Sequence, residues 1–245
     1  IHAVAGSNYY EMKHKFGLSQ NIKIYPKSEY RALLNNSDIN AVIITTRVDS
    51  HYELCREALE AGKDVYMEKP FTRTVEEAER LCAIAEGRGL ILAVGYEYIF
   101  DPNVIAFQKL ITSGYLGGIK NIKLRMLNPS AGRKFDLSTT VIEDLSCHML
   151  SMLYILNGKK YITDIQINSE SDNERADISF NYGGINVVIR LDRDYSGQER
   201  DRTVTVIGEN GTAILDYQQG TFEVFDAADN LINNGDSNFP GILKQ

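Results

Sequence analysis

The chain has 245 residues, which suits one large domain or two modest ones, and 43% of them are hydrophobic, enough for real cores. Its formal net charge of −7 disfavours a nucleic-acid partner, because neutralising phosphates requires a basic surface. No apolar run is long enough for a membrane span, and no signal-like segment is recognisable near Ile1. The 3 cysteines form no C-x-x-C pair, so we expect free thiols in a reducing cytoplasm and no metal site.

Residues 1–98 alternate between strand and helix patterns. Ala41–Thr46 is a β-branched run, and Asp64–Met67 is an apolar stretch that leads directly into Glu68-Lys69-Pro70. Continuous apolar runs predict buried parallel strands, and ligands of such sheets bind beyond the carboxyl ends of the strands, where Lys69 is expected. The expected strands span 1–5, 22–25, 41–45, 64–68 and 91–95, and the expected helices span 9–17, 28–35, 51–61 and 74–87.

Two helix starts in this half carry the pattern of a capping box. Ser50 is followed three residues later by Glu53, and Thr74 is followed in the same way by Glu77. In a capping box the two side chains satisfy each other's free backbone amides. We therefore expect helices to begin just after Ser50 and Thr74.

The pattern changes after Gly95, where strands begin to dominate. Asp101-Pro102 predicts the start of a helix that ends near Ser113, and Asn157-Gly158 ends a second helix over 141–157. Segregated strands after one or two helices are typical of an α+β domain on an open, mainly antiparallel sheet. The expected strands span 119–127, 162–169, 176–182, 185–192, 203–208, 211–216 and 221–226.

The helix over 141–157 carries the clearest candidate chemistry. Asp144 and His148 lie four residues apart, so they are neighbours on one helix face within an otherwise apolar stripe. An ionisable pair in such a stripe needs partners or a cavity. Taken alone, such a pair is more often a surface Asp–His contact that has no chemical role.

Several motifs occur in a characteristic order. They are Ala41–Thr46 with His51 five residues on, Ala61–Val65 leading into Glu68-Lys69-Pro70, Phe100-Asp101-Pro102, Ser113–Gly117, and the Asp144/His148 helix. Together they resemble the Gfo/Idh/MocA family of NAD(P)-dependent oxidoreductases, which includes glucose–fructose oxidoreductase and inositol dehydrogenase. The resemblance implies a Rossmann-like doubly wound domain over 1–98 and a substrate-binding and oligomerisation α+β domain over 99–245.

The resemblance also implies roles for individual residues. His148 would be the general base that takes a hydroxyl proton while the carbon-bound hydrogen leaves as hydride to nicotinamide, work that suits an imidazole at neutral pH. Lys69 would hold the reacting oxygen and stabilise its developing charge, and Asp144 would orient the substrate hydroxyl or the imidazole. The cofactor-binding set would be Thr45, Thr46, His51, Glu68, Lys69, Gly6 and Ser7, although a histidine in the first turn of a helix is more often structural.

The chain departs from the family pattern in three ways. No G-x-G-x-x-G follows an expected strand, and the chain starts at Ile1 within one, so we expect the first βα unit to be missing. Gly6-Ser7-Asn8 stands where many members have an acidic residue that binds the adenosine ribose, so the cofactor is expected to be NAD or NADP. Ile99 and Ser151 replace the arginine and the aspartate that are frequent there, which affects the substrate side.

We therefore expect an oxidoreductase that acts on a hydroxyl or keto carbon of a sugar, cyclitol or sugar derivative. A nicotinamide- or sugar-binding regulator without turnover, and a fragment that binds no cofactor, remain as alternatives. The polar stretch Gly235–Gln245 leads us to expect that a C-terminal portion is also missing. Because the strands after Ile162 outnumber the helices that could cover them, we expect a homodimer or homotetramer formed through that sheet.

Overall fold

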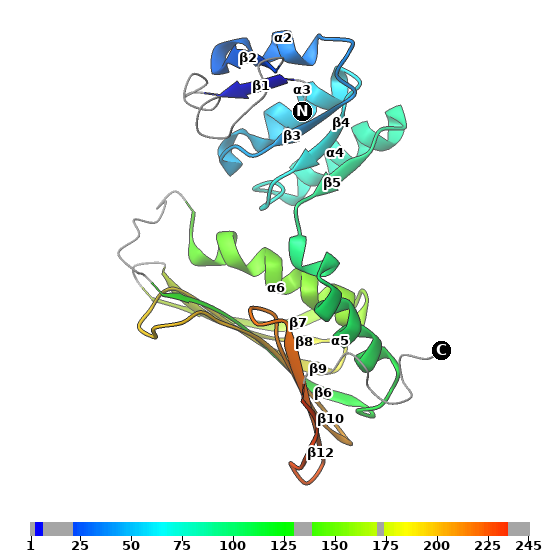
Figure 1. Ribbon diagram of the computed structural model, residues 1–245, viewed down its shortest axis with the longest axis vertical. Coiled ribbons are helices and arrows are strands. Elements are labelled where there is room, and N and C mark those ends of the chain that lie inside the picture. The colour runs from blue at the N-terminus through cyan, green and yellow to red at the C-terminus, as the bar shows by residue number, and fades with distance from the viewer. Residues whose placement is uncertain (1–2, 7–21, 130–138, 171–173, 235–245) are drawn as a thin grey trace. The chain divides into compact units, whose positions relative to one another are not determined.

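The computed structural model describes residues 3–6, 22–129, 139–170 and 174–234 (Figure 1). The chain divides into two compact units, Ile1–Gly95 and Tyr96–Gln245. The helix expected over 9–17 lies outside the described residues.

The first unit contains two parallel sheets, as the apolar runs predicted. In one, β1 (Ala3–Gly6) pairs with β2 (Lys23–Pro26), and in the other the order is β3 (Ala41–Ile44), β4 (Asp64–Met67), β5 (Leu92–Val94). Its helical segments are η1 (Lys27–Glu29), α2 (Tyr30–Leu34), η2 (Val48–Ser50), α3 (His51–Glu60) and α4 (Val75–Arg88).

The sheet β3–β5 has one buried and one exposed face. Ile44, Val65 and Met67 alternate toward α3 and α4, and they form a core with residues such as Leu59 and Leu81. On the other face Ile43 is 71% exposed, Tyr66 is 42% exposed, and Ile91 just before β5 is 68% exposed. Parallel sheets are ordinarily covered on both faces, so these side chains form an apolar surface.

Only one of the two predicted helix caps is formed. The Thr74 side chain accepts a hydrogen bond from the Glu77 backbone N–H at 3.2 Å. At Ser50 the helix begins where predicted, at His51, but the predicted cap is wrong, because a 3₁₀ turn precedes α3 and places Ser50 in a right-handed helical conformation. The Ser50 hydroxyl instead donates to the Thr46 hydroxyl oxygen at 2.8 Å, which ties the helix start back to the end of β3.

The second unit is an eight-stranded sheet with two helices, α5 and α6, on one face (Figure 1). The strand order is β13-β12-β11-β10-β6-β9-β8-β7, and all neighbours are antiparallel except the parallel pair β6–β9. The elements in chain order are η3 (Glu97–Phe100), α5 (Pro102–Thr112), β6 (Ile119–Pro129), α6 (Val141–Asn157), β7 (Ile162–Ser169), β8 (Arg175–Tyr182), β9 (Ile185–Tyr195), β10 (Asp201–Gly208), β11 (Gly211–Asp216), β12 (Thr221–Asp226) and β13 (Leu231–Asn234).

This architecture confirms the predicted fold class, a doubly wound parallel domain followed by a domain on an open, mainly antiparallel sheet. The last strand, β13, was not predicted. The core lies between the sheet and its helices, where Phe107 of α5, Met149 of α6 and Val187 of β9 are almost fully buried. Among the described residues, no helix combines the length and apolarity that crossing a bilayer requires.

Candidate functional site

The residue pair predicted to carry chemistry lies near the start of α6. A capping box fixes that start: the Thr140 hydroxyl accepts from the Glu143 N–H at 3.2 Å, while the Glu143 carboxylate accepts from the Thr140 N–H at 2.8 Å. Asp144 and His148 follow on one face of the helix. The His148 side chain is buried, whereas the Asp144 carboxylate remains 33% exposed.

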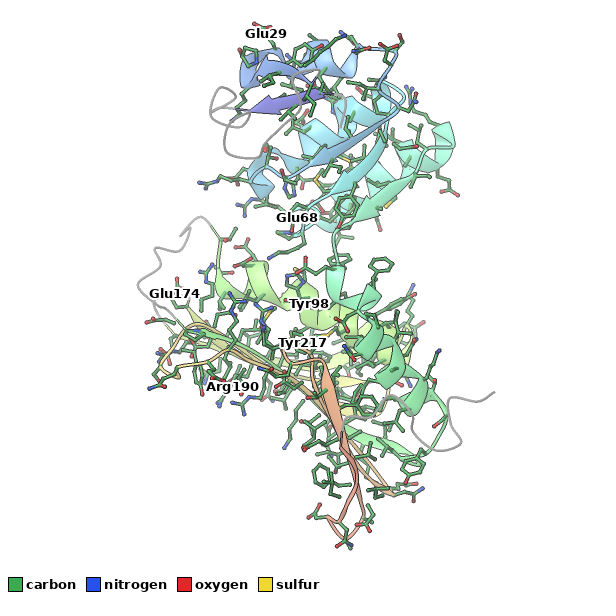
Figure 2. The ribbon with its side chains drawn as sticks, viewed as in Figure 1. Glu29, Glu68, Tyr98, Glu174, Arg190 and Tyr217 are labelled. Carbon is green, nitrogen blue, oxygen red and sulfur yellow. The ribbon has the colours of Figure 1, made fainter. Side chains whose placement is uncertain are left out.

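An aromatic and cationic cluster, which includes Tyr98 and Tyr217 (Figure 2), contacts the imidazole through Tyr98. The Tyr98 ring of η3 meets the His148 ring edge to face, with centroids 5.0 Å apart, and meets the Tyr217 ring in the same way at 5.0 Å. The guanidinium carbon of Arg202 on β10 lies 5.7 Å from the Tyr98 ring centroid, and its Nη1 donates to the Tyr98 hydroxyl. Its Nη2 donates to the Asn128 amide oxygen at 3.2 Å. The contacts hold an aromatic wall against His148.

Burial changes the ionisation of two tyrosines in this part of the unit. Desolvation raises the pKa of Tyr217 well above its ordinary value, and its hydroxyl donates to the Arg125 carbonyl at 3.1 Å. Desolvation also raises the pKa of Tyr96, with a smaller contribution from the Cys147 thiol. Both phenols therefore remain protonated at neutral pH and act as neutral hydrogen-bonding groups.

Arg193 of β9 is a site residue that the sequence did not single out. Its side chain is 3% exposed, its Nη1 lies 3.6 Å from the Asp144 carboxylate, and its Nε donates to the Glu174 carboxylate at 2.9 Å. A signal for it was present, because Ile189, Leu191 and Arg193 alternate on the face that packs against α6. An arginine at an inward position marks a buried ion pair.

The predicted cofactor residues of the first unit lie at the carboxyl ends of β3 and β4. Thr45 and Thr46 are exposed after β3, whereas Glu68 and Lys69 are half-buried after β4. The Glu68 N–H donates to the Ile44 carbonyl at 2.9 Å, which extends the β3–β4 pairing to the start of the turn. This turn is therefore held to the sheet by its backbone.

His51 differs from the other predicted cofactor residues because it is fully buried. Its Nδ1 lies 2.8 Å from the Pro70 carbonyl oxygen, and its Nε2 lies 3.0 Å from the Thr46 carbonyl oxygen. The ring thus joins the segments that follow β3 and β4. Of the remaining pair, Gly6 ends β1, and Ser7 lies outside the described residues.

The structure therefore groups the predicted residues into two sets. Asp144 and His148 lie together in the second unit, and the set around Thr46, Glu68 and Lys69 lies in the first. The replacements at Ile99 and Ser151 both belong to the second unit, where the Ser151 hydroxyl donates to the His148 carbonyl at 2.8 Å.

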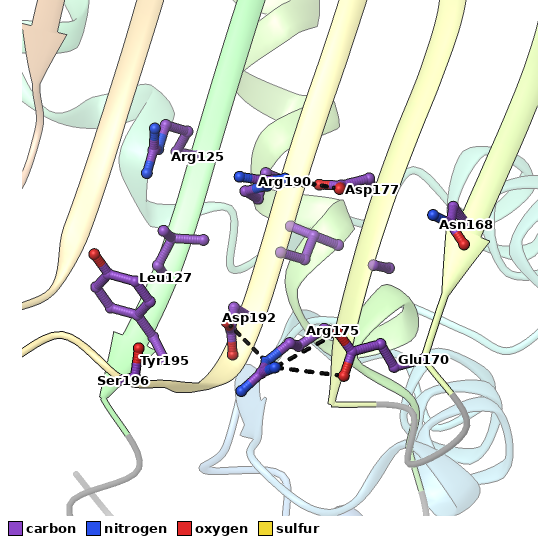
Figure 3. A pocket seen from close by; sticks show the side chains of 12 residues that line it. Arg125, Leu127, Asn168, Glu170, Arg175, Asp177, Arg190, Asp192, Tyr195 and Ser196 are labelled. Atoms are coloured by element: carbon purple, nitrogen blue, oxygen red, sulfur yellow. Dashed lines mark hydrogen bonds and ion pairs between the residues drawn. The ribbon is translucent and has the colours of Figure 1, made fainter.

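The described residues also form a shallow cavity of about 270 Å³ on the sheet face opposite α5 and α6 (Figure 3). It contains none of the predicted site residues. Arg190 pairs with Asp177 at 2.8 Å and Arg175 pairs with Asp192 at 3.1 Å, so its cations are matched by carboxylates. Balanced charge on an open surface does not favour an ionic small molecule.

Comparison with known proteins places these features in a family. Residues 7–96 match the family model described as "Oxidoreductase family, NAD-binding Rossmann fold" (GFO_IDH_MocA). An uncharacterized oxidoreductase of Escherichia coli, YhhX, is 30% identical over 174 residues, which cover 68% of this chain and 50% of that protein. UDP-N-acetylglucosamine 3-dehydrogenase of Acidithiobacillus ferrooxidans is 26% identical over 208 residues, which cover 84% of this chain and 62% of that protein.

A solved structure has the same fold. It is an inositol dehydrogenase homolog from Azotobacter vinelandii, complexed with NADH and myo-inositol, and it superposes with a TM-score of 0.81 at 22% identity over 91% of this chain and 63% of that one. At this identity the likeness concerns the fold alone. The chain spans 50% to 63% of the length of the first curated relatives that it matches. Through the matched residues 7–96 and these relatives, the chain belongs to the Gfo/Idh/MocA oxidoreductase family.

Proposed function

We propose that this protein transfers a hydride between a nicotinamide cofactor and the hydroxyl or keto carbon of a sugar, cyclitol or sugar derivative. The observation that carries the proposal is the pair Asp144 and His148 on one face of α6, with the buried Arg193 beside Asp144 and the Tyr98 ring against His148. Membership in the family supports it, as do the names of relatives such as inositol 2-dehydrogenase of Ralstonia nicotianae, 29% identical over 132 residues. The catalytic residues are Lys69, Asp144 and His148.

His148 acts as the general base in this proposal. Its imidazole accepts the substrate hydroxyl proton during oxidation and returns it during reduction, a role typically worth about 10²- to 10⁴-fold in rate. Its burial against Tyr98 keeps bulk water from the ring. Asp144 orients the substrate hydroxyl or the imidazole. The Lys69 ammonium stabilises negative charge that develops on the reacting oxygen.

The cofactor is NAD or NADP, and its nicotinamide ring supplies the hydride acceptor or donor. Thr45, Thr46, Glu68 and Lys69 fit the nicotinamide end, because they present hydroxyl, carboxylate and ammonium groups at the carboxyl ends of parallel strands. Gly6 ends β1, and with Ser7 it is proposed to leave room for a ribose phosphate. His51 holds this edge in place through the contacts of its ring nitrogens with the carbonyl oxygens of Thr46 and Pro70.

The test compares His148→Ala with the unchanged protein on a panel of cyclitols, sugars and nucleotide sugars, each with NAD and NADP. Reduction of the cofactor is followed by absorbance, and cofactor affinity by calorimetry. We expect turnover to fall about 10²- to 10⁴-fold while the cofactor Kd changes little, because proton transfer contributes only in the transition state. Equal losses in turnover and in cofactor affinity would count against a general base. Cofactor binding without turnover on any substrate would favour a regulator.

We further propose that the protein forms a homodimer, or a homotetramer built from it, through the sheet face opposite α5 and α6. On the open face the pair of Arg190 with Asp177 lies beside the apolar side chain of Val188, which is 41% exposed. A two-fold axis would bring each pair onto a matching surface, and a stable contact should bury more than about 1,000 Å². A monomer at micromolar concentration in sedimentation velocity would refute this assembly, and Val188→Asp should weaken it.

A further inference from the structure

The most constrained charged group among the described residues is Arg193. Along β9 the side chains of Ile189 and Leu191 point into the core between the sheet and α6, and Arg193 takes the next position in that alternation. Its guanidinium is 3% exposed. Burying a cation in this way is costly unless every part of it is paired, so its contacts show what it does.

The contacts divide between two elements. Nε and Nη2 donate to the two oxygens of the Glu174 carboxylate at 2.9 and 3.1 Å, a bidentate pair that fixes the plane of the guanidinium. The backbone N–H of Arg193 also donates to the Glu174 carbonyl at 2.9 Å. Glu174 therefore anchors the arginine side chain, and Nη1 and the second N–H of Nη2 are directed toward α6.

These remaining nitrogens reach the start of α6. Nη2 donates to the Thr139 carbonyl at 2.9 Å, one residue before the helix cap, and Nη1 lies 3.6 Å from Oδ2 of Asp144. The Asp144 carboxylate also lies in the first helical turn, where the helix dipole favours an anion. Arg193 thus contacts both the entry of the helix and one acidic side chain of its first turn, Asp144.

We propose that Arg193 is a positioning residue that holds the Asp144 carboxylate, as an anion, in the orientation that it needs beside His148. Glu174 neutralises and orients the guanidinium, so that Arg193 can serve Asp144 without leaving a buried charge. This inference rests on the proposed function, because it gives Arg193 a role only through Asp144. It accounts for a buried ion pair at the one end of β9 that faces the helix start.

The test is a cycle of four proteins: unchanged, Arg193→Met, Asp144→Asn and the double variant. In the unchanged background, Arg193→Met should lower kcat about 10- to 100-fold with little change in KM, the loss typical when an orienting partner is removed. In the Asp144→Asn background it should cause no further loss, because its effect passes through Asp144. Equal losses in both backgrounds would overturn the proposal, and so would no loss in the first.

Matched variants separate positioning from general damage. Arg56→Met removes an arginine that pairs with surface carboxylates of α3, Glu53 and Glu60, and that belongs to no proposed site or interface, so kcat should not change. Arg193→Lys should recover only part of the activity, because an ammonium cannot reproduce the fork that spans Glu174 and Asp144. If Arg193→Met does not fold, Arg193→Lys replaces it in the cycle with the same expected non-additivity.

A second readout requires no substrate. Thermal unfolding of the same four proteins should show that Asp144→Asn lowers Tm more when Arg193 is present than it does beside Arg193→Met, where only the helix-dipole contribution remains. Equal Tm shifts in both backgrounds would overturn the contact itself. Failure of the proposed function is distinguishable, because the unchanged protein would then show no turnover, while the Tm cycle would still report whether Arg193 and Asp144 are coupled.

Discussion

Replacing His51 with alanine tests whether one buried imidazole holds the edge of the first unit together. The ring is fully buried at the start of α3, and its two nitrogens lie 2.8 and 3.0 Å from the carbonyl oxygens of Pro70 and Thr46. These carbonyls belong to the segments that follow β4 and β3, beside the predicted residues Lys69 and Thr46. Loss of the ring should therefore loosen both segments at once.

The magnitude follows from the two losses that the substitution causes. A neutral imidazole donates from one nitrogen, and removing a donor from a buried carbonyl costs about 1–3 kcal/mol. Both nitrogen–oxygen contacts are only part-buried, so water can replace the donor and the loss should lie near the lower figure. The cavity left by a buried ring adds about 1–2 kcal/mol. The total is about 2–3 kcal/mol.

Amide hydrogen exchange across residues 41–46 and 64–70 measures this loss within the first unit, without assuming that both units unfold together. A loss of 2–3 kcal/mol corresponds to exchange about 30- to 140-fold faster. His51→Asn and His51→Gln place a single amide donor near the positions of Nδ1 and Nε2 respectively, so the better rescue identifies the carbonyl that needs the donor. Exchange less than about threefold faster in His51→Ala would refute the reasoning.

Three further outcomes are expected. Arg31 donates to both carboxylate oxygens of Glu57 at 2.7 and 2.9 Å and lowers the pKa of that carboxylate. The pair therefore stabilises the fold above about pH 4.3, and this stabilisation is lost as the pH falls through the lowered pKa. Urea unfolding at several pH values should show that the free energy of unfolding of Glu57→Gln falls less steeply at acid pH than that of the unchanged protein. Burial raises the pKa of Cys55 to about 12, so a thiol reagent at pH 8 should label the exposed Cys82 rapidly, and fast labelling of Cys55 in mass spectra would contradict its burial. Phe107→Ala should cost about 3–5 kcal/mol in the unfolding of the second unit, because this ring is fully buried and meets Phe222 edge to face; calorimetry with a loss below 1 kcal/mol would contradict that packing.

The parts of the fold that were predicted correctly are those in which local pattern and burial agree. Residues 64–67 form β4, the central strand of a parallel sheet between β3 and β5, as the apolar run predicted. The helix 141–157 was predicted from its apolar stripe and the Asn157-Gly158 stop, and α6 has these bounds. In both cases the local sequence pattern alone was sufficient to predict the element.

The misses arise where a neighbouring turn or a distant partner decides the outcome. Ser50 has the residue spacing of a capping box, but the preceding 3₁₀ turn gives it helical backbone angles, from which its side chain cannot cap. The complete capping box at Thr140 and Glu143 was visible in the sequence and was overlooked. The contact of Tyr98 with Arg202 joins residues that are distant in sequence and could not be predicted from either one alone.

Arg190 and Arg193 on β9 show why position matters more than residue type in locating the candidate site. Arg190 points to the open face, where its pair with Asp177 is half exposed and contributes little to the stability of the fold. Arg193 points to the covered face, where the same chemistry is tolerated only because Glu174, Asp144 and a backbone carbonyl share the guanidinium. An apolar residue at position 193 would meet the packing requirement of that face at lower cost. The retained cation therefore indicates a requirement other than stability at the start of α6, where Asp144 and His148 lie.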